Sequence, residues 1–245
     1  VMLCVHADWS IGDPEGFRQT LRRAADVAAA HSSLVTVGIV PSRPDPGFGY
    51  IQPGEPVPGD HAGEARRAAR FTEKPDRATA ASMVRDGFLW NSGIFAWRAG
   101  DFLDEIRAHT PEISRALPAA RSGDARRFFA DVTPISVDHG VLERSAKVLV
   151  IAGDFGWDDV GTWAALRRIR PRDDRGNVTA GSGTAVLHDA ANSVVYAEGS
   201  AVVLYGVSDL VVVARGDLTL VTTTERAADL KSLVDALPAS VRDRA

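Results

Sequence analysis

The run Leu34-Val35-Thr36-Val37-Gly38-Ile39-Val40 is short, apolar and rich in β-branched residues, and it ends at Pro41. Such a run is typical of a strand buried on both faces of a mainly parallel sheet. An amphipathic helix precedes it, because Asp13-Pro14-Glu15 supplies an N-cap, a first-turn proline and a first-turn acid before apolar residues recur at helical spacing. Residues 1–5 form an earlier strand-like run. The β-α-β order predicts a doubly wound α/β layer.

Further strands and helices are expected up to residue 170. Residues 53–66 are rich in proline, glycine and charge, which indicates a surface loop or a hairpin tip. The sequence also predicts strands at 68–73 and 147–151, two short strands meeting at a bend within 88–97, and helices at 75–85, 100–109, 112–120, 124–130 and 162–169.

The sequence pattern changes after residue 170. Short strand-like runs, separated by turn residues, lie at 177–187, 193–197, 201–207, 210–214 and 218–222. Their regular spacing predicts a small all-β domain that is β-solenoid-like. We therefore expect one domain at 1–170 and a second at 171–245. The second domain is expected to end in a helix near 225–236, whose apolar face docks on a neighbour.

The composition is that of a globular protein. Of the 245 residues, 45% are hydrophobic and 24% are charged, and the net charge is −4. These values exclude a disordered chain, and they argue against nucleic acid as a partner. Among the 28 basic residues only Lys74, Lys147 and Lys231 are lysines, so Lys74 stands out from an arginine-rich background.

The single cysteine, Cys4, allows no intrachain disulfide. No apolar stretch approaches the roughly 18 to 20 residues that a membrane helix needs, and no secretory leader pattern opens the sequence. We expect a soluble, cytoplasmic protein with no membrane partner. Because the sequence opens inside a strand-like segment, we also expect its first domain to be incomplete at the N-terminus.

Three short motifs place polar residues at predicted strand ends, where ligands bind in open α/β sheets. In Phe48-Gly49-Tyr50-Ile51 the glycine lets a ligand approach the backbone, and a β-bulge or hairpin bend is the alternative. In Glu73-Lys74-Pro75 the carboxylate suits sugar hydroxyls and the ammonium suits a phosphate, and a solvated charge pair is the alternative. In Trp90-Asn91-Ser92-Gly93 the amide suits hydroxyl recognition, although an asparagine in a turn needs no ligand.

A fourth segment, Gly156-Trp157-Asp158-Asp159-Val160-Gly161-Thr162-Trp163, places two adjacent acids before a predicted helix. Their oxygens suit a hard cation such as Mg²⁺. Helix N-capping by either acid is the alternative. Asp8, which follows the first predicted strand, is the candidate for a second carboxylate ligand.

Taken in order, these segments resemble the mannose-1-phosphate guanylyltransferase family. The resemblance also includes Ala7-Asp8, Gly38-Ile39 and Ser136-Val137-Asp138-His139-Gly140-Val141-Leu142-Glu143, and it continues from Asn177 through the C-terminal strands. It implies a doubly wound mixed sheet, the Rossmann-like fold of nucleotide-diphospho-sugar transferases, with a small C-terminal β-domain. It further implies a reaction of GTP with mannose 1-phosphate to GDP-mannose and pyrophosphate, with Mg²⁺ as cofactor, in a homodimer joined through the C-terminal domain.

The resemblance implies a role for individual residues. Substrate binding is assigned to Gly49, Tyr50, Glu73, Lys74, Asn91 and Asp138, with Lys74 on the sugar phosphate. Asp8, Lys74 and Asp159 are the implied catalytic residues, and Asp8 and Asp159 are the implied metal ligands. Glu143 is expected to support the sugar pocket together with Asp138.

Two features depart from the family pattern. The 245 residues contain no glycine-rich, arginine-containing loop of the kind that grips the nucleoside triphosphate, and Trp9 stands where the family usually has a histidine. We therefore expect these 245 residues alone to make no GDP-mannose. One alternative is a pyrophosphorylase for another hexose 1-phosphate. The other is a catalytically silent subunit that binds a sugar nucleotide or serves assembly.

Overall fold

The computed structural model describes residues 1–60, 63–228 and 230–242, and the chain divides into two compact units. The first unit comprises residues 1–7 and 11–157, and the second comprises residues 8–10 and 158–245. The predicted boundary between residues 170 and 171 falls inside the second unit. The candidate sugar-phosphate residues therefore belong to the first unit, whereas Asp8 and Asp159 belong to the second.

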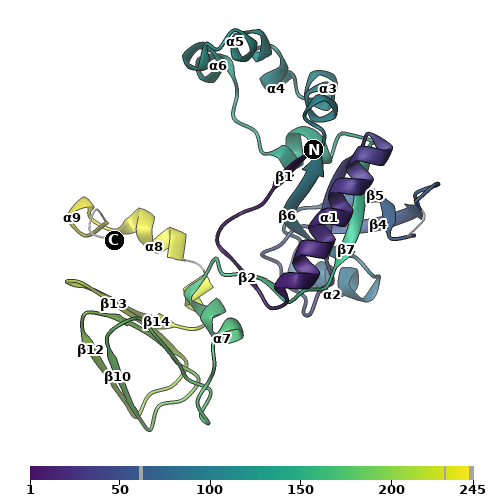
Figure 1. Cartoon of the computed structure of the whole chain (residues 1–245). Coiled ribbons are helices and arrows are strands. Elements are labelled where there is room, and N and C mark those ends of the chain that lie inside the picture. Colours follow the sequence, from purple (N-terminus) through teal and green to yellow (C-terminus); the bar gives the residue numbers. More distant parts are fainter. Residues whose placement is uncertain (61–62, 229, 243–245) are drawn as a thin grey trace. The chain divides into compact units, whose positions relative to one another are not determined.

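A six-stranded sheet forms the centre of the first unit (Figure 1). Its strands are β1 (Met2–Cys4), β3 (Leu34–Ile39), β4 (Tyr50–Pro56), β5 (Ala65–Thr72), β6 (Leu89–Trp97) and β7 (Val148–Gly153). Their order is β1-β6-β3-β7-β5-β4, and β4 also pairs with β6. β3 and β7 are parallel, whereas β1–β6, β3–β6, β4–β5, β4–β6 and β5–β7 are antiparallel. The sheet is mixed, as the family resemblance implies.

The mainly parallel surroundings predicted for residues 34–40 are wrong. β3 has one parallel neighbour, β7, and one antiparallel neighbour, β6. All six residues of β3 are buried. A continuous apolar run indicates burial on both faces of a sheet, but it carries no information about the direction of the neighbouring strands.

The first helix, α1 (Pro14–His31), packs against the sheet. Asp13 caps it, because its Oδ1 accepts hydrogen bonds from the backbone N–H groups of Glu15 and Gly16, each at 3.1 Å. Small and branched residues, Ala24, Val27 and Ala28, are its buried positions, and they allow the helix to approach β3 closely. The predicted N-cap and helical spacing are confirmed.

The other helices of the first unit are α2 (Arg77–Arg85), α3 (Ala99–His109), α4 (Pro111–Ser114), α5 (Leu117–Arg121) and α6 (Ala125–Asp131), with a π-helical turn, η1 (Asp138–Leu142). The single helix predicted at 112–120 is instead split into α4 and α5. Pro118 explains the break, because its ring would collide with the carbonyl group of Ser114 in a continuous helix.

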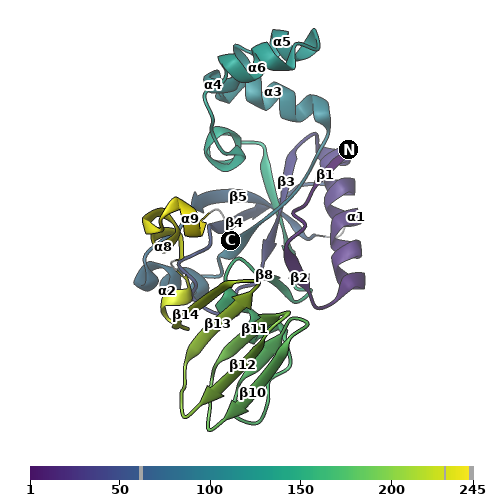
Figure 2. The same cartoon turned by 90° about the vertical axis from the view of Figure 1, so that its left-hand side faces the viewer.

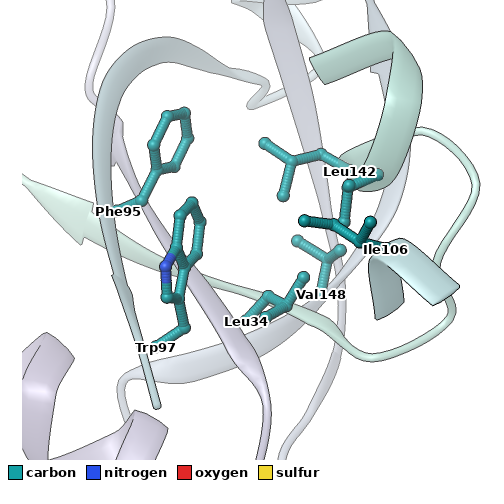
Figure 3. Packing of buried hydrophobic residues seen from close by; sticks show 7 residues of the cluster. Leu34, Phe95, Trp97, Ile106, Leu142 and Val148 are labelled. Atoms are coloured by element: carbon teal, nitrogen blue, oxygen red, sulfur yellow. The ribbon is translucent and has the colours of Figure 1, made fainter. Parts of the chain in front are cut away.

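An apolar cluster holds η1 and α3 against the sheet (Figure 3). The Trp97 ring stacks on Phe95 at a centroid distance of 5.2 Å and on Phe102 at 4.5 Å. Ile106 and Leu142 bring the two helical segments into the same cluster. Burying a side chain such as Leu142 contributes roughly 1.5–3 kcal/mol, so the packing fixes the turn that carries Asp138.

β6 is one strand, which corrects the prediction of two short strands meeting at a bend. Its register with β3 shifts, so that Ile94 pairs with Val37 while Asn91 pairs with Gly38. Two extra residues, Ser92 and Gly93, form a bulge in which Gly93 has φ +74°. Such bulges redirect side chains beside binding sites. The bend-like composition around Asn91 therefore marks a bulge within a continuous strand.

The second unit is built mainly of β9 (Val178–Ala180), β10 (Thr184–His188), β11 (Val194–Glu198), β12 (Ala201–Tyr205), β13 (Leu210–Arg215) and β14 (Leu218–Thr223). β9, β11 and β13 pair in parallel, as do β10 and β12, and β14 pairs antiparallel with β13. Figure 2 shows β10 and β12 beside β11, β13 and β14. Val178, Val194 and Val211 occupy matched positions in successive strands and are fully buried. This stacking is the predicted solenoid-like arrangement.

Short helices accompany these strands: α7 (Leu166–Ile169), α8 (Leu230–Ala236) and α9 (Ala239–Arg242). The predicted C-terminal helix at 225–236 is a 3₁₀ turn, Arg226–Ala228, followed by α8, with residue 229 outside the described residues. Leu233 and Val234 are exposed on α8. None of the helices that the structure describes is long and apolar enough to cross a membrane.

Candidate functional site

Glu73 and Lys74 form a charged corner between β5 and α2. Lys74 has φ +43°, a left-handed conformation that costs a non-glycine residue roughly 1–2 kcal/mol. Adjacent side chains of an extended strand point to opposite faces. The left-handed turn at Lys74 ends this alternation, and its Nζ lies 3.2 Å from Glu73 Oε1. The strained backbone thus presents the ammonium and the carboxylate together.

Gly49 lies directly beside this corner. A Cβ atom added at Gly49 would be 2.5 Å from Glu73 Oε2 and 3.4 Å from Asn91 Cβ. The absent side chain therefore makes room for the Glu73 carboxylate. The Gly49 carbonyl accepts a hydrogen bond from the Asn91 N–H at 2.8 Å. Gly49 joins two of the predicted residues, Glu73 and Asn91, into one cluster.

Tyr50 is fully buried. Its hydroxyl group donates a hydrogen bond to the Asp45 carbonyl at 3.1 Å and accepts one from the Asp45 N–H at 3.0 Å. The side chain therefore holds the loop that leads to Gly49 and has its polar atom already engaged. The resemblance implies that Tyr50 binds substrate. The geometry instead favours a supporting role for its side chain, because the hydroxyl group is engaged by Asp45.

Asn91 and Asp138 meet although 47 positions separate them in the sequence. Asn91 Nδ2 donates a hydrogen bond to Asp138 Oδ1 at 2.8 Å. Asn91 Oδ1 accepts a longer one from the Gly93 N–H at 3.4 Å. The bulge in β6 and the packing of η1 thus fix the amide between a carboxylate and the backbone. The structure brings together Gly49, Glu73, Lys74, Asn91 and Asp138, which we call the sugar-phosphate cluster after the role that the resemblance implies.

We expect Gly49→Ala to weaken sugar binding roughly tenfold or more, because the new methyl group would displace Glu73, and a hydrogen bond to a charged group contributes roughly 1.5–3 kcal/mol. The fold should persist, since Gly49 does not have a positive φ. Calorimetric titration with mannose 1-phosphate measures the effect. Gly100→Ala is the control, because nothing lies within 4 Å of the added Cβ. Equal affinity in both variants would contradict the close packing of Gly49 and Glu73.

Two residues that the sequence analysis left without a role border these segments. His139 follows Asp138, and its Nδ1 lies 2.9 Å from Glu143 Oε1. The spacing of four residues between a histidine and a glutamate on a helical turn is the signal that would have found this pair. The guanidinium carbon of Arg43 lies 5.0 Å from the centroid of the Trp90 ring and 5.7 Å from that of the Phe48 ring. The contact of Arg43 with the Trp90 ring could not be predicted from the sequence, because the fold brings these distant residues together.

The aromatic residues of the glycine motifs pack on one another. Phe48 lies 4.9 Å from Trp90 and 5.4 Å from Trp157 between ring centroids, and the two tryptophans are 6.4 Å apart. Trp90 and Trp157 are buried. These rings are therefore core that supports the Gly49 loop and the start of β6, and they are not an exposed stacking platform.

Asp8 and Asp159 border a small sheet formed by β2 (Trp9–Ile11) and β8 (Trp157–Asp159). The Gly12 N–H donates to the Gly156 carbonyl at 3.0 Å, and the Asp13 N–H donates to the Phe155 carbonyl at 2.9 Å. These bonds show that the two segments run in opposite directions. Asp8 precedes β2 and Asp159 ends β8, so both residues lie at the same end of the sheet. The pairing provides the backbone proximity that their sequence separation left open.

The two adjacent acids differ in their surroundings. Asp158 binds Arg168 through two contacts of 2.6 Å, and its side chain is 13% exposed. The Asp159 carboxylate lies over Gly161, where an added Cβ would be 3.3 Å from Oδ2. The fold thus pairs Asp158 with Arg168, and the absence of a side chain at Gly161 lets the Asp159 carboxylate lie close to the backbone there.

The resemblance implies Asp8 and Asp159 as Mg²⁺ ligands, and carboxylate oxygens are ligands that suit this ion. Among the residues that the structure describes, no group of three or more His, Cys, Asp or Glu side chains is arranged to hold a metal. Mg²⁺ is usually held by one or two carboxylates, with water and substrate phosphates completing its octahedron. Two carboxylates at paired strands, such as those of Asp8 and Asp159, match that number of protein ligands.

The chain is similar to known nucleotidyltransferases over almost its whole length. A family model described as nucleotidyl transferase matches residues 1–175, and one described as MannoseP isomerase/GMP-like beta-helix domain matches residues 183–237. Mannose-1-phosphate guanylyltransferase ManC of Salmonella typhimurium is 39% identical over 253 aligned residues, which cover 99% of this chain and 52% of the relative. The mannose-1-phosphate guanylyltransferase of Escherichia coli K12 gives the same identity and coverage. The chain thus spans about half the length of these relatives.

A solved structure supports the same relationship. A crystal structure described as mannose-1-phosphate geranyltransferase from Thermus thermophilus superposes with a TM-score of 0.86 at 36% sequence identity, covering 95% of this chain and 68% of the other. The resemblance drawn from the sequence motifs is confirmed by these matches. The chain belongs to the nucleotidyl transferase family.

Proposed function

We propose that the protein containing this chain is a mannose-1-phosphate guanylyltransferase. A phosphate oxygen of mannose 1-phosphate attacks the α-phosphorus of GTP, the bond to the β-phosphate breaks, and GDP-mannose and pyrophosphate form. The observation that carries the proposal is the sugar-phosphate cluster, in which Glu73, Asn91 and Asp138 converge beside Gly49 and Lys74. Family membership and the relatives that carry this name support it.

The chemistry requires positioning more than proton transfer. A sugar phosphate is already an anionic nucleophile, so no general base is needed, and catalysis depends on alignment and charge neutralisation. Glu73 accepts hydrogen bonds from sugar hydroxyls, Asn91 is held by Asp138 for the same task, and Lys74 places a compact charge on the sugar phosphate. Asp8 and Asp159 would hold Mg²⁺, which supplies charge neutralisation on the nucleotide phosphates.

The cellular location and the oligomeric state of the protein are proposed from its cysteine and from the exposed surface of its second unit. The one cysteine, Cys4, is a free thiol, which is in keeping with a reducing cytoplasm. Exposed apolar side chains on β10, β12 and β14 support a homodimer joined through the C-terminal domain; they are Val186, Val203, Tyr205 and Val221. Surfaces of this kind often mark protein interfaces.

Binding of mannose 1-phosphate to the chain tests the proposed substrate. Calorimetric titration should show saturable binding of mannose 1-phosphate, and binding of glucose 1-phosphate should be weaker by roughly tenfold or more, because a misplaced hydroxyl leaves a polar side chain such as Glu73 unpaired. Stronger binding of glucose 1-phosphate would instead support a pyrophosphorylase for another hexose. Absence of binding to either ligand would contradict the assignment of the sugar-phosphate cluster.

A further inference from the structure

The imidazole of His139 borders the sugar-phosphate cluster, and none of the roles described above uses it. His139 follows Asp138 on η1, and Asp138 accepts the hydrogen bond of Asn91 at 2.8 Å. Its Nδ1 is engaged by Glu143 at 2.9 Å. The His139 side chain is nevertheless 54% exposed, so the ring is held at one nitrogen and remains accessible to a ligand.

The charges around this ring favour a cation. Glu143 and Asp138 lie on the same turn, and Glu73 approaches from the loop before α2, where it is paired with Lys74. The hydrogen bond that His139 donates to Glu143 and the negative charge of Glu143 raise the pKa of His139, and Glu73 and Asp138 raise it further, although partial desolvation of the ring opposes them. The protonated imidazolium therefore persists to higher pH than in an unperturbed histidine.

The assigned residues alone would hold a phosphate poorly. Glu73, Asp138 and Glu143 carry three negative charges, against the single positive charge of Lys74. A sugar phosphate is close to a dianion at neutral pH, and like charges at short range repel it. A second cation beside Lys74 would offset this repulsion.

The bond to Glu143 determines what the other ring nitrogen presents to a ligand. In the neutral ring, Nδ1–H donates to the carboxylate and Nε2 carries a lone pair, which repels a phosphate oxygen. In the protonated ring Nε2 also carries a hydrogen, so it becomes a charged donor. Protonation therefore changes Nε2 from an acceptor to a donor without moving the ring.

We propose that protonated His139 is a second phosphate-binding residue beside Lys74, and that sugar-phosphate affinity falls as pH rises through the titration of this imidazole. This inference rests on the proposed function, because it names a further ligand of the same substrate. The sign follows from the direction of protonation: the favourable charge is present below the pKa of His139 and is lost above it. Below about pH 6 the ligand itself takes up a proton, so the diagnostic range lies above that value.

Binding measured between about pH 6.5 and 9 tests the inference. Calorimetric titration of the chain with mannose 1-phosphate should show affinity falling by roughly tenfold across this range, the magnitude expected for a charged hydrogen bond. His139→Asn keeps a donor near the Nδ1 position for Glu143 and removes the imidazolium. This variant should bind weakly at all pH values, with less than about a twofold change. Glu143→Gln should shift the fall in affinity to lower pH, because the main cause of the raised pKa is removed.

A matched control exists in the same unit. His109 also lies four residues from a glutamate, with its Nε2 3.2 Å from Glu105 Oε2, but it lies on α3 and outside the sugar-phosphate cluster. His109→Asn should retain the full pH dependence of the unsubstituted chain. In NMR titrations, mannose 1-phosphate should raise the pKa of His139, and it should leave the positions of the His109 ring signals unchanged.

The outcomes separate this inference from the proposed function. If the unsubstituted chain binds mannose 1-phosphate and His139→Asn shows the same pH dependence, the role of His139 is wrong while the proposed substrate stands. If the chain does not bind mannose 1-phosphate at the acidic end of the range, both are wrong. Mannose should lack the pH dependence, because it carries no phosphate group for the imidazolium to bind. A pH-dependent affinity for mannose itself would overturn the inference.

Discussion

Replacement of Asp159 by asparagine is expected to abolish Mg²⁺-dependent pyrophosphate release by the enzyme while leaving the fold intact. Metal ions contribute several kcal/mol to the stabilisation of charge in a transition state, and about 4 kcal/mol corresponds to roughly a thousandfold in rate. Asparagine keeps the shape of the side chain beside Gly161 but removes the charge that attracts a hard cation. Turnover and the binding of Mn²⁺, followed by electron paramagnetic resonance, measure the two consequences separately.

Asp158→Asn is the matched control, because Asp158 is adjacent to Asp159 and is not one of the proposed metal ligands. Asp158 forms an ion pair with Arg168 at 2.6 Å, so its replacement should lower stability and leave Mn²⁺ binding unchanged. A partly exposed ion pair contributes about 1 kcal/mol or less, which a thermal melt detects. Loss of Mn²⁺ binding in Asp158→Asn together with its retention in Asp159→Asn would reverse the assignment. Asp8→Asn should weaken Mn²⁺ binding as Asp159→Asn does.

Sequence patterns predicted the elements of the fold better than their connections. The apolar run of β3 and the N-cap at Asp13 are local features, and both predictions are confirmed. The direction of β6 beside β3 depends on residues more than fifty positions away, which no local pattern reports. The bulge at Gly93 has the glycine and polar composition of a turn, so composition alone could not separate the two.

In the candidate site too, local features could be predicted from the sequence and contacts between distant residues could not. The resemblance named Glu73, Asn91 and Asp138, and the structure brings them together through β5, β6 and η1. Tyr50 was also named, but its hydroxyl is occupied by Asp45, a contact that depends on how the loop folds. Likewise, nothing in the sequence indicates that Asp158 pairs with Arg168, ten positions further along the chain. The sequence predicts which kinds of side chain belong to the candidate site, but it does not predict which of them already bind another residue of the chain.

Replacement of Lys74 by alanine is expected to weaken mannose 1-phosphate binding by about 10- to 100-fold, with a much smaller effect on GTP. A hydrogen bond between charged groups contributes roughly 1.5–3 kcal/mol, and each 1.4 kcal/mol is about tenfold in affinity. The existing pair with Glu73 is largely exposed, since the Lys74 side chain is 67% accessible. Its loss therefore costs little stability, and the affinity change reports on the ligand. Calorimetry with mannose 1-phosphate and the KM values of the two substrates measure it.

Arg77→Ala tests whether position or only charge matters. Arg77 is an exposed cation three residues from Lys74, in the first turn of α2. Arg77→Ala therefore changes the net charge by the same amount as Lys74→Ala but leaves the Lys74 ammonium beside Glu73. Affinity close to that of the unsubstituted chain is expected for Arg77→Ala. Equal losses in the two variants would reduce the role of Lys74 to long-range attraction, which salt would screen. A loss confined to Lys74→Ala that persists at high salt requires direct contact, because the Lys74 ammonium is held next to the carboxylate of Glu73, the residue proposed to bind the sugar.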